Sequence, residues 1–362
     1  MIEKGKFGVS EAVSLITITI VAKIFYTSPS AVVQIAGTAG WYLTIISGGA
    51  AFLSFMFVIM LLKRCPGKNI VDAYSTAFGP FIGFVFSFLL ASALMFGAVS
   101  NTAEFSYVIQ SYVLPRTPLF FIIGTCTIGV AILSFLGLES IARFSRLSVL
   151  ILLTGFTAVI LLGMQNYSIH RILPILGYGL KTTIYHGLLR SSFYADVIIL
   201  AVFTGSLQGL KFVKKAGFLS LAISTIIVSI SLLAFSLTFP YFVGEELTAP
   251  MYVLASLIDY GRFFQRLESI FLFIWYISSF IGVVALFYTS LCVYCQIFKI
   301  NDKKSIVFPF AIIFCTASLL PSSIITVVDA IVPLYREYIW VVIFLPPIIG
   351  LLTSKLMKRG AS

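Results

Sequence analysis

Two ionisable residues lie deep inside apolar stretches, where a charge is costly. Lys23 sits about 14 residues into the first apolar run, and Asp196 sits about 12 residues into a later one. A lysine near the centre of a bilayer costs roughly 2.5–3.5 kcal/mol on insertion scales, so each residue needs a partner or a function. Opposite charges at similar depth relieve each other's desolvation. We therefore predict that Lys23 and Asp196 pair, directly or through one water molecule.

Such a pair has a functional and a structural interpretation. In the first, a zwitterionic ligand offers its carboxylate to Lys23 and its amine to Asp196, and so replaces the internal pair. In the second, the pair only fixes helix packing, or Asp196 faces a cytoplasmic water cavity without any contact to Lys23. Glu104 also has two interpretations, because it could face a vestibule or the lipid headgroups. The residues alone leave these alternatives open.

The composition assigns these residues to a membrane protein. Of 362 residues, 60% are apolar or aromatic and 10% are charged, and the mean hydropathy is +1.08. Soluble domains carry about 25% charged residues. This chain has too little charge to cover a soluble surface of its size, which excludes a soluble enzyme, a disordered chain and a disulfide scaffold. Its partner is the lipid bilayer rather than nucleic acid, despite a net charge of +11.

The apolar runs are long enough for helices that cross a membrane, which need roughly 20 residues each. Because backbone groups in lipid must be satisfied internally, continuous apolar runs of this length must be helical. We predict an all-α membrane protein, a single domain over residues 1–362, with ten spans: 9–36, 41–62, 80–112, 118–137, 145–164, 184–207, 213–239, 266–298, 305–324 and 335–356.

The basic residues give an orientation. With a cytoplasmic N-terminus, sixteen of the 24 Lys and Arg residues fall on the inner side and seven on the outer side, Arg190 and Arg336 among these seven. Such an excess on the inner side is the pattern that sets topology, so we expect both termini in the cytoplasm. Five spans then precede a second half that starts outside. The two halves, residues 9–164 and 184–356, are therefore expected to be inverted repeats, as in many secondary transporters.

In inverted repeats of this kind, the first helix of each half is broken at the binding site. Pro29 lies inside the first span, where it removes one backbone donor and disfavours helix at the residue before it. We expect the first span to be interrupted between Ala22 and Ser30. We also expect the sixth span to be irregular between Ser191 and Gly205, and the two breaks to touch at mid-depth.

The chain carries no motif that indicates catalysis, a metal or a cofactor. There is no phosphate-binding loop, no dinucleotide fingerprint and no metal-ligand spacing, and His170 and His186 have no acid or nucleophile at recognisable spacing. The spacing of Cys292 and Cys295 is that of a redox motif, but two thiols embedded on one helix indicate packing. We expect no enzyme activity, no bound metal and no cofactor.

Several short segments together resemble a known family, the B subunits of bacterial spore germinant receptors, also called spore germination permeases. They occur in order along nearly the whole chain: GTAGW at 37–41, KRCPGK at 63–68, FG at 78–79, LPRTP at 114–118, GLESIAR at 137–143, LPILGYG at 173–179, and RLES at 266–269 with Trp275 and Phe280.

The resemblance implies a leucine-transporter-like fold within the amino acid–polyamine–organocation superfamily. It implies a nutrient sensor of the spore inner membrane that works with receptor A and C subunits and binds a small molecule such as an amino acid. A stand-alone secondary transporter of amino acids or related solutes, with or without proton coupling, is the alternative, and a structural partner with a vestigial pocket is a third. By analogy with the fold, the ligand-binding residues are expected to be Lys23, Ala22, Ile24, Asn101, Thr102, Phe193, Tyr194, Asp196, Tyr288 and Thr289.

Overall fold

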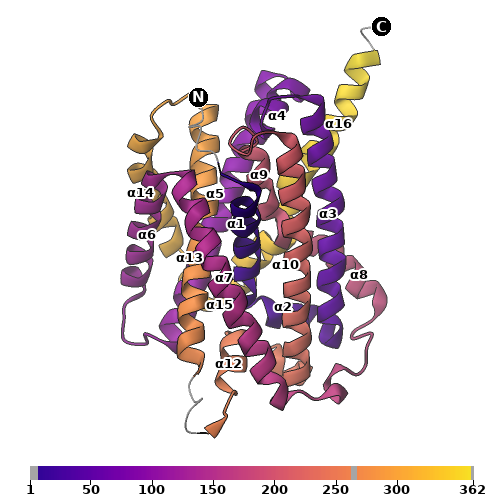
Figure 1. Ribbon diagram of the computed structural model, residues 1–362, viewed down its shortest axis with the longest axis vertical. Coiled ribbons are helices and arrows are strands. Elements are labelled where there is room, and N and C mark those ends of the chain that lie inside the picture. Colours follow the sequence, from indigo (N-terminus) through magenta and orange to yellow (C-terminus); the bar gives the residue numbers. More distant parts are fainter. Residues whose placement is uncertain (1–6, 262–266, 360–362) are drawn as a thin grey trace.

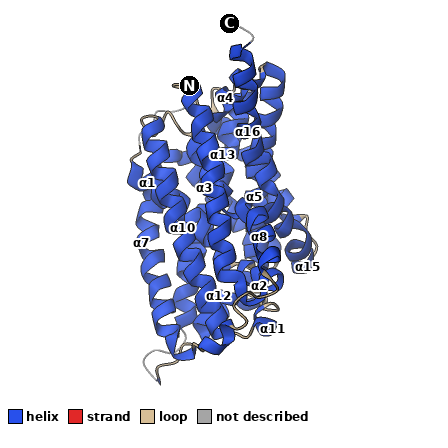
Figure 2. Cartoon of the chain, turned by 90° about the vertical axis from the view of Figure 1, so that its right-hand side faces the viewer, coloured by secondary structure: helices blue, strands red, loops and turns tan. Residues whose placement is uncertain are grey.

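The computed structural model describes residues 7–261 and 267–359 and is helical nearly throughout, with no strand in these two ranges (Figures 1 and 2). The long helices run roughly parallel to one another and form one elongated bundle. α1 begins and α16 ends at the same end of this bundle. That arrangement agrees with an even number of membrane crossings.

The first half of the chain follows the predicted order of spans. Its elements are α1 (Val9–Val21), the 3-10 helix η1 (Ala22–Phe25), α2 (Ser28–Ala36), η2 (Gly37–Ala39), α3 (Gly40–Arg64), α4 (Ile70–Phe78), α5 (Pro80–Tyr112), α6 (Leu119–Leu136) and α7 (Leu138–Leu162). The short 3-10 turns η3 (Gly163–Asn166) and η4 (Ile169–Ile172) then lead to the second half.

The second half contains more interruptions. Its elements are α8 (Leu180–Leu189), the 3-10 segment η5 (Arg190–Ile198), α9 (Ile199–Val202), α10 (Leu210–Thr238), α11 (Tyr241–Gly244), α12 (Pro250–Ser256), α13 (Leu267–Ile297), α14 (Lys303–Leu319), α15 (Ile324–Thr326), the π-helical turns η7 (Val327–Ile331) and η8 (Leu334–Tyr338), and α16 (Ile339–Arg359).

Six helical segments in the described ranges are each long and apolar enough to cross a membrane. A bent pair, Lys303–Leu319 with Ile324–Thr353 at 106°, brings the number to as many as seven. The first and sixth predicted spans are missing from this set as whole helices because both are broken. The protein is therefore a multi-pass membrane protein, while the count of ten spans stays a prediction.

The predicted starts of two spans are wrong. The fifth span begins at Leu138, seven residues before its predicted start at residue 145. The last span was expected to begin at residue 335, but helical structure resumes at Ile324 and continues through two π-helical turns into α16. The apolar run that precedes residue 335 belongs to the same helical segment. This difference moves Arg336 from the expected outer edge of the last span to a position well inside a helical segment.

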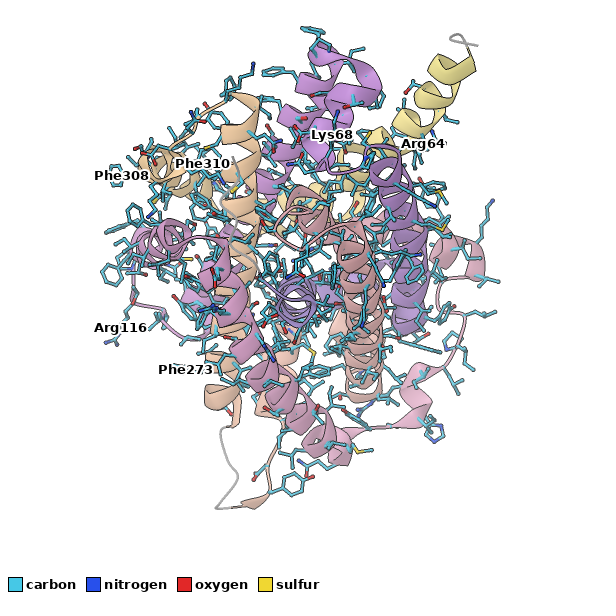
Figure 3. The ribbon with its side chains drawn as sticks, turned by 45° about the horizontal axis from the view of Figure 1, so that its top comes forward. Arg64, Lys68, Arg116, Phe273, Phe308 and Phe310 are labelled. Atoms are coloured by element: carbon cyan, nitrogen blue, oxygen red, sulfur yellow. The ribbon has the colours of Figure 1, made fainter. Side chains whose placement is uncertain are left out.

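The surface and the core differ as a lipid environment requires. Large apolar side chains such as Phe81, Phe273 and Phe308 are more than 70% exposed, and Figure 3 shows Phe308 on the outer side of α14. Arg64 and Lys68 lie near α4 and α16, at the end that carries the chain termini. α1 occupies the centre, packed against α7, α10 and α13 (Figure 1). The first span is thus held away from lipid, where its polar residues can be paired.

Candidate functional site

The first span is interrupted where the sequence predicts. α1 ends at Val21, a 3-10 turn follows, and Tyr26 adopts an extended conformation with φ −89° and ψ −154° before α2 begins at Ser28. Pro29 lies in the first turn of α2, a position where its missing N–H is tolerated. The backbone N–H of Thr27, freed by the break, donates to Glu104 Oε1 at 2.9 Å. The buried carboxylate therefore satisfies the broken backbone.

The sixth span is irregular over the predicted stretch. Its nine residues from Arg190 to Ile198 form a 3-10 segment between α8 and α9, and all nine are buried. Runs of 3-10 helix longer than three or four residues are uncommon and often mark a functional hinge. Spans one and six meet at these breaks, because Lys23 Nζ donates to the carbonyl oxygen of Phe193 at 2.8 Å.

Lys23 and Asp196 form a direct ion pair at this junction. Lys23 Nζ lies 2.7 Å from Asp196 Oδ2, and the two side chains are 0% and 1% exposed. The hydroxyl of Tyr335 donates to the other carboxylate oxygen, Oδ1, at 2.9 Å. The ammonium group also lies 5.2 Å from the ring centroid of Phe193 and 5.4 Å from that of Tyr335. The predicted pairing is confirmed, with the aromatic rings shielding it from lipid.

A second buried ion pair supports the break in span one. Arg336 donates to Glu104 Oε2 at 2.6 Å, and the Thr27 hydroxyl donates to Glu104 Oε1 at 2.5 Å. The Glu104 and Arg336 side chains are at most 1% exposed. Glu104 thus faces neither lipid headgroups nor an open vestibule, and the outer placement of Arg336 is wrong. The guanidinium carbon of Arg336 also lies 5.7 Å from the ring of Tyr26.

A third pair connects the sixth span to the last one. Arg190 donates to Glu337 Oε1 at 3.1 Å, with side chains 4% and 13% exposed. The backbone N–H of Trp340 donates to Ser192 Oγ at 2.8 Å. Arg190, like Arg336, was expected on the outer side and is buried instead. The three pairs carry no net charge together, which limits the cost of burying six charges.

The sequence contains a signal for the depth of Arg336 and Glu337 that the predicted boundary conceals. Arg336 and Glu337 follow an apolar run that starts at Ile324, so both lie about 12 residues into a helical segment rather than at its edge. Setting the span start at residue 335 concealed this depth. The π-helical turns that carry Tyr335 to Glu337 are themselves a feature that often accompanies functional sites.

Two cavities lie beside this network. A small one of about 10 Å³, roughly enough for one water molecule, is lined among others by Ile24, Ser28, Phe193 and Tyr194. A larger one of about 460 Å³, which we call the vestibule, lies at the end away from the chain termini. Its lining comprises Thr27, Ser30, Ala31, Gln34, Glu245, Glu246, Leu247, Thr248, Ile324, Ile325, Val328 and Asp329. Thr27 belongs both to the vestibule wall and to the Glu104 network.

The predicted ligand residues fall into two groups. Lys23, Ala22, Ile24, Phe193, Tyr194 and Asp196 come together at the two breaks, as the Lys23 pair and the small cavity show. The others lie apart from both cavities. Asn101 and Thr102 are buried on α5 near Glu104. Tyr288 lines a separate cavity with Lys303, and the Thr289 hydroxyl donates to the carbonyl oxygen of Ala285.

Comparison with known sequences assigns the chain to a family. The family described as Spore germination protein matches residues 6–324, which is most of the chain. The chain belongs to the spore germination protein family. It is 24% identical to Spore germination protein A2 of Bacillus subtilis (strain 168), over 98% of this chain and 97% of that protein. It is 21% identical to Spore germination protein KB of the same organism, over 86% and 83% of the two chains.

Solved structures with a similar fold are membrane transporters, which confirms the leucine-transporter-like fold. Mhp1, a nucleobase-cation-symport-1 family transporter, has a TM-score of 0.69 at 13% identity, covering 91% of this chain and 75% of that one. A Na+-coupled sialic acid symporter has a TM-score of 0.61 at 12% identity, covering 91% and 77%. At such low identity the likeness shows the shared fold alone.

Proposed function

We propose that this spore germination protein is the nutrient-sensing membrane subunit of a germinant receptor. In this proposal it binds a small zwitterion, such as an amino acid, at the paired breaks of spans one and six. The observation that carries the proposal is the fully buried Lys23–Asp196 pair, which joins the two broken segments directly. A zwitterion presents the same two charges in the opposite sense, so its carboxylate suits Lys23 and its amine suits Asp196.

The energetics of the buried pair make it suitable for exchange with a ligand. Each charge alone would be costly at this depth, so the pair separates only when another charge compensates each partner. The small cavity holds about one water molecule, and an amino acid therefore needs the breaks to open. Span ten must respond to such opening, because Tyr335 holds Asp196 and Arg336 holds Glu104.

The vestibule is the route by which a ligand would reach the breaks of spans one and six. It reaches Thr27, whose N–H and hydroxyl hold Glu104 at the edge of the network. A ligand arriving there would bind better to an opened arrangement of spans one, six and ten than to the paired one. A ligand shifts a conformational equilibrium by its difference in affinity for the two states. We propose that receptor A and C subunits in the spore inner membrane detect this shift, with both termini of the chain in the cytoplasm.

A ligand screen tests the binding proposal. The purified protein would be heated with each of the common amino acids, and a true ligand at 100 times its dissociation constant should stabilise it by about 2.7 kcal/mol. The same ligand should not stabilise the Lys23→Met variant, but it should still stabilise Lys214→Met, which changes an exposed lysine at the start of α10. Equal stabilisation of the wild type and Lys23→Met would contradict the site.

A stand-alone secondary transporter is the second candidate, and the shared fold with two symporters favours it. The two functions differ in flux. Sustained uptake of the ligand by proteoliposomes containing only this protein would indicate a transporter. Binding without uptake would support the receptor.

A further inference from the structure

A third cavity lies at the end of the bundle that carries the chain termini, between the turn joining α6 to α7 and the turn joining α13 to α14. Its volume is about 100 Å³. Most of its lining is polar or charged: Ser134, Phe135, Gly137, Tyr288, Asn301, Asp302, Lys303, Lys304 and Val307. This cavity is separate from the proposed nutrient site, because neither Lys23 nor Asp196 lines it.

Two long helices begin at this cavity. Gly137 precedes the first turn of the 25-residue helix α7, and Asp302 precedes that of the 17-residue helix α14. The first N–H groups of a helix lack partners within it, and the aligned peptide dipoles add a partial positive charge there. Both features favour an anion at α7, whose first turn has no side-chain cap, whereas at α14 the Asp302 carboxylate already accepts from the Lys304 N–H.

The side chains around the cavity carry a net positive charge. Lys303 and Lys304 line it, and Lys304 Nζ lies 4.8 Å from the ring centroid of Phe135. Asp302 opposes them with one negative charge. Its carboxylate accepts hydrogen bonds from the Ser305 hydroxyl and the Lys304 N–H, and these bonds lower the pKa of the Asp302 carboxyl below its ordinary value. The Asp302 carboxylate is thus hydrogen-bonded within the first turn of α14. The two lysines and this one carboxylate give the cavity lining a net charge of +1.

Ser134 supplies an independent indication of a ligand. Its side chain lines the cavity and is 3% exposed, and its hydroxyl has no hydrogen-bond partner among the described residues. Other hydroxyls on the same helix donate to the backbone one turn earlier, as Thr127 does to Ile123. A buried hydroxyl without a partner is costly unless something in the cavity accepts a hydrogen bond from it.

We propose that this cavity binds a phosphate group, with the Ser134 hydroxyl, the two lysines and the first turn of α7 around its oxygens. The shared chemistry is a phosphate anion of −1 or −2 charge. Its source is either the headgroup of an anionic phospholipid at the membrane interface or a free phosphate compound.

Binding assays with two probes distinguish these sources. The full-length protein in neutral detergent would be titrated with dioleoylphosphatidylglycerol and, separately, with inorganic phosphate, and its melting temperature followed. Stabilisation by the lipid alone assigns the site to a headgroup, while stabilisation by inorganic phosphate assigns it to a free phosphate compound. If neither probe stabilises the protein, the proposal is wrong.

Matched variants separate a built site from general surface charge. Ser134→Ala, which removes one buried hydroxyl, should weaken binding at least fivefold, and Lys303→Gln with Lys304→Gln should abolish it. The control is Lys214→Gln with Lys215→Gln, because these exposed lysines also lie near the start of a long helix, α10. The control should bind as tightly as the wild type. Equal weakening by the control pair, or no weakening by Ser134→Ala, would overturn the proposal.

Discussion

Each ionisable side chain of the central network has its charge met by a specific partner. Lys23 faces Asp196, Glu104 faces Arg336, and Arg190 faces Glu337. Removing one partner from a buried pair strands a charge, which costs about 3–5 kcal/mol, whereas exposed pairs contribute about 0–1 kcal/mol. The six charges should therefore respond to mutation as three coupled pairs.

Glu104→Gln tests this coupling. The variant leaves the Arg336 charge without a counter-charge, so we expect the free energy of unfolding to fall by about 3–5 kcal/mol. Glu139→Gln is the matched control, since Glu139 pairs with Arg143 on an exposed helix surface and should cost less than about 1 kcal/mol. Thermal or denaturant unfolding in detergent measures both. Similar losses of unfolding free energy for the two variants would show that the Glu104–Arg336 pair contributes no more to stability than an exposed pair.

At this scale, the sequence predicted one pair and missed two. Lys23 and Asp196 could be found because each interrupts a run of apolar residues near its centre. Arg336 was missed because the last span was predicted to begin at residue 335, which placed Arg336 at an edge. Arg190 was missed because it lies only six residues into the predicted sixth span. Their partners are set by tertiary contacts between spans that are 147 and 232 positions apart in the chain, and no local pattern encodes such contacts.

The helices depart from regular α-helical geometry at the positions where they contribute residues to the buried ion-pair network. The breaks in spans one and six and the π-helical turns of span ten all lie where ionised side chains meet. The sequence predicted both breaks, from Pro29 and from the expected inverted repeat. It did not predict the π-helical turns, because nothing in apolar periodicity distinguishes them from an α-helix. α5 packs against these turns, with Gly97 facing the ring of Tyr335.

Gly97→Ala tests the packing between α5 and span ten. A Cβ atom at Gly97 would lie 2.6 Å from the ring and hydroxyl of Tyr335, the side chain that donates to Asp196. Overpacking of this kind costs about 1–3 kcal/mol, and it should also displace the Tyr335 hydroxyl. The melting temperature should fall accordingly.

Gly49→Ala on α3 is the control for this substitution, because no neighbouring atom lies within 4 Å of a Cβ atom at Gly49. Alanine in a helix is favoured over glycine, so the control should keep or slightly raise the melting temperature. A Gly97→Ala protein as stable as the control would show that Tyr335 moves aside freely and does not fix Asp196.

The whole molecule is a multi-pass helical bundle with both chain ends at one end of it (Figure 1). The excess of basic residues predicts that this end is cytoplasmic. Moving Arg190 and Arg336 into the network leaves five of the seven expected outer basic residues, so the bias that supports this orientation increases. Of these five, Arg262 and Arg266 lie outside the described residues. Composition alone was sufficient for the membrane assignment, because it depends on total charge and not on packing.

Reporter fusions test the orientation. A fluorescent protein attached to either terminus should fluoresce, and alkaline phosphatase attached to either terminus should be inactive, because both termini are expected in the cytoplasm. Alkaline phosphatase inserted after residue 246 should be active, because this loop lines the vestibule, which is expected on the outer side of the membrane. An active enzyme at either terminus would reverse the predicted topology and place the vestibule inside the cell.

The most direct test of the central proposal is the nutrient response of spores that carry Lys23→Met, measured together with the abundance of the protein in their inner membrane. If the Lys23–Asp196 pair is the site that a nutrient replaces, the variant should be present at wild-type abundance and the response should be lost. The contradictory result is a variant of low abundance that the second change Asp196→Leu restores together with the nutrient response. That outcome would show that the pair only holds spans one and six together.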